Sequence, residues 1–129
     1  MSYYLCFKKN GVPICNYCRA HPIYSVFEDR ADFDTWTQIT KEDLEYGKRK
    51  AQHKLTWIDN ELYNYEKILE GIHTFDERHD IIVAMNELED EFENYRKVLI
   101  MIDMLIDIWK QSDMSDDNYE PTPMEWGIF

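Results

Sequence analysis

The fold of this chain is decided by two stretches, residues 44–69, LEYGKRKAQHKLTWIDNELYNYEKIL, and residues 81–109, IIVAMNELEDEFENYRKVLIMIDMLIDIW. In each, mostly apolar side chains recur at alternating spacings of three and four, which is typical of a helix that packs lengthwise on another helix. Turn residues separate the two stretches, and so short a connection makes neighbouring helices antiparallel. We therefore predict an antiparallel helical hairpin, similar to a coiled coil, over residues 40–112.

Capping residues set the expected limits of both helices. Thr40 with Asp43 forms a capping box at the start of the first helix, and Thr74 with Glu77 repeats the pattern for the second. Gly71 is expected to end the first helix in a left-handed conformation. The second helix is predicted to overshoot the first, which leaves its apolar residues near Trp109 to be covered by other parts of the chain.

Residues 1–39 are expected to form a small unit of a β-hairpin and a short helix. Asn10-Gly11 is a strong two-residue turn signal, and a symmetric register about it places Cys6 opposite Cys15. The same register gives one apolar face to Leu5, Phe7, Val12 and Ile14. A short helix is predicted after His21-Pro22, and a third strand within residues 33–39. Fold class is therefore α+β, mostly α, in one compact domain.

The tail, residues 113–129, reads as extended and acidic. It ends in an apolar segment, which we call the C-terminal hook and define as Trp126, Ile128 and Phe129. Because a cluster of large apolar side chains is usually covered, we expect the hook to dock on this protein or on another.

Charge is strongly unequal along the chain. The whole sequence carries 14 Lys and Arg against 26 Asp and Glu, a net charge of −12. Residues 1–54 account for 9 basic and 7 acidic side chains, while residues 55–129 hold 5 and 19. Such acidity argues against direct nucleic-acid binding. No signal peptide or membrane-spanning segment is recognisable, so we expect a cytoplasmic protein without a membrane partner.

One constellation has metal-ligand spacing. Cys6, Cys15, Cys18 and His21 combine a Cys-x-x-Cys pair with a following histidine, as structural zinc sites do. Ordinary thiols remain the favoured interpretation and a Cys6–Cys15 disulfide a third, so no cofactor is expected unless zinc staples the unit. Motifs for a catalytic nucleophile, a phosphate-binding loop or a zinc protease are absent from the sequence, which favours a protein that is not an enzyme.

The acidic residues of the second helix are the main candidates for function. They are expected on its outward face, and their simplest interpretation is a solvated surface; the alternative is a surface that attracts a basic protein partner. A phage-type inhibitor that mimics nucleic acid is the most concrete form of that alternative. A structural or adaptor module, including a homodimer, is the competing hypothesis. The candidate partner-binding residues are Glu87, Glu89, Asp90, Glu91, Glu93, Trp57, Tyr63, Trp126 and Phe129.

Overall fold

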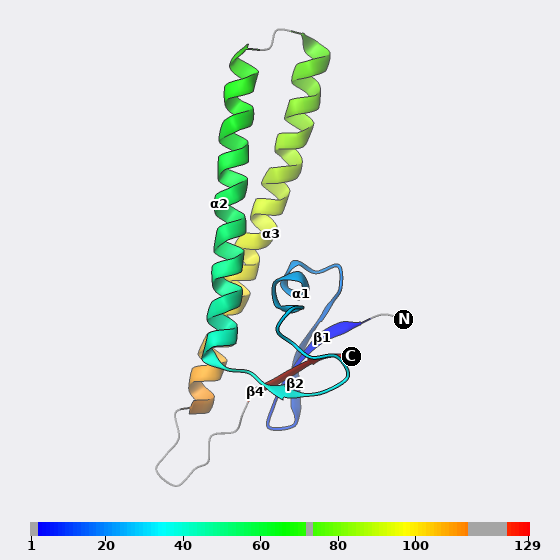
Figure 1. Ribbon diagram of the computed structural model, residues 1–129, viewed down its shortest axis with the longest axis vertical. Coiled ribbons are helices and arrows are strands. Elements are labelled where there is room, and N and C mark those ends of the chain that lie inside the picture. Colours follow the sequence, from blue (N-terminus) through cyan, green and yellow to red (C-terminus); the bar gives the residue numbers. More distant parts are fainter. Residues whose placement is uncertain (1–2, 72–73, 114–123) are drawn as a thin grey trace.

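The computed structural model describes residues 3–71, 74–113 and 124–129, and it has the expected α+β architecture (Figure 1). A four-stranded antiparallel sheet has the strand order β2-β1-β4-β3. The sheet packs against two long helices, which form an antiparallel hairpin. In chain order the elements are β1 (Tyr4–Lys9), β2 (Val12–Cys18), α1 (Pro22–Phe27), β3 (Thr37–Gln38), α2 (Lys41–Gly71), α3 (Phe75–Asp113) and β4 (Met124–Ile128).

The hairpin of β1 and β2 turns where the sequence indicates, but its register differs from the prediction. Asn10 and Gly11 have φ values of 56° and 72°, as a two-residue hairpin turn requires. A bulge then shifts the register, so that Phe7 pairs with Cys15 and Cys6 pairs with Asn16. The predicted Cys6–Cys15 pairing is therefore wrong, because the bulge inserts one residue into β2.

The apolar face predicted for the hairpin is buried on β1 but not on β2. Leu5 and Phe7 of β1 have no exposed surface, whereas Val12 and Ile14 of β2 are 62% and 37% exposed. Val12 keeps its predicted pairing with Lys9 and so shares the face of Leu5 and Phe7, but Cys15 takes the predicted place of Ile14 opposite Phe7. As expected from Pro13, which cannot donate a hydrogen bond to a neighbouring strand, β2 lies at the edge of the sheet.

The C-terminal hook belongs to the centre of the sheet. β4 pairs with β1 on one side and with β3 on the other. Trp126 and Ile128 are buried, and the ring of Trp126 lies 5.2 Å from that of Phe27. The expected docking of the hook therefore takes place within this chain. Of the tail predicted as extended, residues 124–128 form a strand, and residues 114–123 lie outside the described residues. The third strand expected within residues 33–39 is limited to β3.

Both long helices begin one residue after the predicted cap residues, Thr40 and Thr74. The Thr40 backbone N–H donates to Asp43 Oδ2 at 3.0 Å and the Asp43 N–H to Thr40 Oγ1 at 3.1 Å, a reciprocal capping box. Gly71, however, is the last residue of α2 and has no positive φ, so the predicted left-handed cap is wrong.

The apolar core lies where the sheet, α1 and the lower halves of α2 and α3 meet. It contains residues of α2 only as far as Ala51 and residues of α3 only from Tyr95 onward. Trp109 of α3 packs against this core and donates from Nε1 to the carbonyl of Ile39 at 3.0 Å. Residues 3–39 and β4 therefore cover the overshooting end of α3, as its apolar circumference requires.

Candidate protein-binding surface

The upper half of the helical hairpin carries most of the negative charge. We define the acidic arm as residues 57–71 and 74–93, which project beyond the N-terminal unit in Figure 1. The sequence of the arm contains 12 Asp and Glu side chains against Lys67 and Arg78, a net charge of −10. It is held together by a line of buried and half-buried residues between the helices, which includes Ile58 and Leu88. The arm is thus a narrow two-helix rod with charge on its surface.

The five acidic residues predicted to bind a partner have different surroundings. Glu87, Glu89 and Asp90 are exposed, and none forms an ion pair with any residue that the structure describes. Glu91 lies 3.0 Å from Lys54 Nζ, and both side chains are partly buried. Glu93 accepts two hydrogen bonds from Arg96, at 3.0 and 2.6 Å, and this pairing lowers the pKa of Glu93. The charge available to a partner is therefore greatest at Glu87, Glu89 and Asp90.

The predicted aromatic contacts also separate into two groups. Trp57 and Tyr63 are 48% and 57% exposed on the arm, with the ammonium groups of Lys54 and Lys67 at 4.6 and 5.1 Å from their ring centres. Trp126, by contrast, is 1% exposed. It offers no surface to a partner, so we remove it from the candidate site.

Phe129 is half-buried, with its ring centre 4.7 Å from that of Trp36. Sequence reasoning missed Phe75, which is 80% exposed and stacks on His79. The sequence feature that could have indicated its exposure is its position outside the apolar repeat of the second helix.

The four candidate zinc ligands are not brought together. Residues opposite each other on antiparallel strands share a face, so Cys15 lies on the face of Phe7 whereas Cys6 lies on the other face with Asn16. Cys18 is exposed, and His21 accepts a hydrogen bond from the N–H of Ile23 through Nδ1 at 3.2 Å. Within the described parts of the chain, no three His, Cys, Asp or Glu side chains are grouped to hold a metal ion. None of the three cysteines forms a disulfide.

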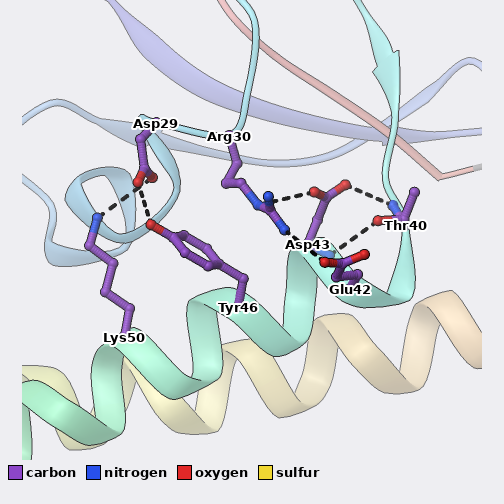
Figure 2. Close-up of polar contacts among 7 residues, drawn as sticks. All are labelled: Asp29, Arg30, Thr40, Glu42, Asp43, Tyr46 and Lys50. Carbon is purple, nitrogen blue, oxygen red and sulfur yellow. Dashed lines mark hydrogen bonds and ion pairs between the residues drawn. The ribbon is translucent and has the colours of Figure 1, made fainter.

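A set of polar contacts fastens the base of the arm to the N-terminal unit (Figure 2). The Tyr46 hydroxyl donates to Asp29, and Lys50 Nζ lies 3.5 Å from the same carboxylate. Arg30 Nε lies 3.3 Å from Asp43, and its guanidinium lies 4.5 Å from the centre of the Tyr46 ring. Burial raises the pKa of Asp29, but the Tyr46 hydrogen bond and the Lys50 charge outweigh it and lower that pKa overall. These contacts orient the arm.

An apolar groove lies between the edge strand and α3, on the lower half of the molecule. Its volume is about 400 Å³, and its lining includes two methionines that sit beside the exposed Ile14. The sequence did not predict it, because the symmetric hairpin register places Cys15 and Tyr17 on the face opposite Ile14, whereas all three line the groove. The lining residues are Ile14, Cys15, Tyr17, Met101, Met104, Leu105 and Ile108.

Comparison with protein-family models, with curated proteins and with solved structures finds no significant match to this chain. Among the described residues, no helix combines the length and apolar character needed to cross a membrane.

Proposed function

We propose that this chain acts by binding a protein partner through the acidic arm and that it is not an enzyme. The partner presents a basic surface, and the most specific form of the proposal is an inhibitor, such as a phage-type protein, that occupies a nucleic-acid-binding site. We place this activity in the cytoplasm, where unpaired thiols such as the three found here persist. The observation that carries the proposal is the net charge of −10 on a rod that projects away from the core.

The charge density of the arm supports this form of the proposal. The α3 part of the arm, residues 75–93, is about 28 Å long at 1.5 Å per residue. Lys54 and Arg96, just outside the arm, pair with Glu91 and Glu93, so a net charge of −8 remains over that length, or one charge per about 3.5 Å. Duplex DNA carries one per about 1.7 Å and a single strand one per about 3.4 Å. The arm therefore has about the linear charge density of a single strand, and a groove that binds phosphates would attract it.

Exposed aromatic and apolar side chains add a second kind of contact. Trp57, Tyr63 and Phe75 are all about half exposed or more, and they lie among the carboxylates of the arm. Aromatic residues are enriched where proteins bind each other tightly, whereas carboxylates chiefly accelerate and orient association. We infer that charge directs the arm to its partner and that these rings contribute to the lifetime of the complex.

The test uses the full chain immobilised on a resin. A cell lysate enriched for basic proteins on a cation exchanger is passed over wild type and over a triple variant, Glu87→Gln, Glu89→Gln, Asp90→Asn. The control variant, Glu28→Gln, Asp32→Asn, Asp34→Asn, removes the same number of charges from the N-terminal unit. We expect wild type and control to retain nucleic-acid-binding proteins that the arm variant releases.

Two further measurements decide the outcome. Because ions screen exposed charges over about 10 Å at 0.1 M and about 3 Å at 1 M, rising salt should elute the retained proteins. Duplex DNA should displace them if the arm occupies a nucleic-acid site. Retention that is equal for the arm variant, or that neither salt nor DNA reduces, contradicts the proposal.

A further inference from the structure

A second repeat of three-four spacing runs along α3, on the side away from α2. Its members are Lys97, Ile100, Met104 and Asp107, separated by three, four and three residues. All four are exposed, and Ile100 and Met104 keep 53% and 60% of their surfaces in water. In an α-helix, such spacing places the four side chains in one stripe, which we call the outer stripe. Its spacing is that of a helix with a packing partner, but no partner helix covers it within the described chain.

The outer stripe is complementary to the same stripe of a second chain that runs in the opposite direction. If two copies of α3 lie antiparallel and cross at residue 102, Lys97 of one copy faces Asp107 of the other, and Ile100 faces Met104. By symmetry each of these contacts occurs twice. Neither Lys97 nor Asp107 has an ion-pair partner within 4.0 Å among the described residues, and Glu93, whose pKa the Lys97 charge helps to lower, is itself bound by Arg96. We propose that this stripe binds a second copy of the same chain and makes a symmetric antiparallel dimer. The proposal does not depend on the function proposed for the acidic arm.

The distribution of charge selects the antiparallel arrangement. In a parallel pair, two arms of net charge −10 would lie side by side at the usual distance of about 8–10 Å between helix axes. In the antiparallel pair the arms point in opposite directions, and the centres of their α3 segments are separated by about 50 Å along the axis. That separation far exceeds the screening length of about 8 Å at physiological salt. Repulsion between the arms therefore disfavours the parallel pair only.

The surroundings of the stripe favour a helix as its occupant. The apolar groove adjoins the stripe through Met104, so a helix placed on the stripe would also cover exposed groove residues such as Ile14. Addition of a strand to the sheet is disfavoured, because the open edge of β2 carries Pro13 and a bulge. A second copy of α3 provides the apolar side chains and also the opposite charges at the required spacing.

The test measures the mass of the full chain by sedimentation over two decades of protein concentration. We expect a concentration-dependent shift from 15.7 kDa to twice that mass. Lys97→Asp alone and Asp107→Lys alone each place like charges opposite each other, and each should weaken the dimer at least about tenfold. The double variant restores opposite charges with the positions exchanged, and it should bring the dissociation constant back to within about threefold of wild type.

Controls separate this contact from general effects of charge or folding. Lys67→Asp makes the same change of charge on the arm and should leave dimerisation unchanged. Met104→Asp should give a monomer whose helical circular dichroism matches that of wild type, because Met104 is exposed in the single chain. A wild-type chain that stays monomeric throughout overturns the proposal. A dimer that tolerates both single reversals, or that the double variant fails to restore, also overturns it.

Discussion

Replacing Gly47 by alanine tests how closely α1 approaches α2. Gly47 is buried in the middle of a helix, where alanine is ordinarily favoured over glycine by about 1 kcal/mol. Here the added methyl group would overlap the ring of Phe27, with Cδ1 at 3.1 Å and two further ring carbons closer still. The substitution therefore sets a gain in helix propensity against overpacking of the core.

The structure indicates that overpacking is the larger effect. Phe27 has no exposed surface, and its ring lies against Trp126, so it must move by about 1 Å in a space that is already filled. Such overpacking costs about 3 kcal/mol at the upper end of its usual range. After the gain in propensity, we expect Gly47→Ala to lower the free energy of unfolding by about 2 kcal/mol. For a chain of this length the midpoint of thermal unfolding should fall by about 8 °C.

Urea and thermal unfolding followed by circular dichroism measure this change. Gly71→Ala is the matched control, because it adds a methyl group to the same helix where no atom lies within 4 Å. We expect that variant to be unchanged or more stable by up to about 1 kcal/mol. In a Phe27→Leu background, which shortens the facing side chain, Gly47→Ala should lose much of its cost. If Gly47→Ala raises the stability of the wild-type chain, our description of the α1–α2 contact is wrong.

Three other substitutions examine separate features. Trp126→Ala should lower the free energy of unfolding by about 3–5 kcal/mol, measured in urea, because it empties the centre of the core; a loss below about 1 kcal/mol would place the hook outside it. Thr40→Ala should cost about 1 kcal/mol through loss of the capping box, and an unchanged urea midpoint would contradict that assignment. Because the folded-state pKa of Asp29 is lowered, its contribution to stability is present above its ordinary pKa of 3.8 and disappears as the pH falls through the folded value. Tyr46→Phe should raise that pKa, read by NMR titration, and reduce the loss of stability in acid; an unshifted titration would exclude the hydrogen bond.

The helical hairpin could be predicted because its signal is local and repeated many times. Each turn of α2 and α3 adds another apolar residue at the same angle, and the capping box at Thr40 involves atoms only three residues apart. The turn at Asn10-Gly11 is local in the same sense, since its conformation depends on two residues that tolerate positive φ. The concentration of acidic residues on the arm likewise follows from their positions in the sequence alone.

The sheet could not be derived in this way, because its contacts join distant residues. β4 lies between β1 and β3 although more than 100 residues separate it from β1, and nothing in MEWGI specifies those neighbours. The bulge opposite Phe7 puts Cys6 and Cys15 on opposite faces, and the packing of the sheet beside α3 leaves Ile14 partly exposed in the groove. Which side chains form the groove and the outer stripe follows from the same long-range packing. The helical repeat of apolar residues and the capping contacts depend on residues a few positions apart. Strand order and surface exposure, in contrast, are properties of the whole folded chain.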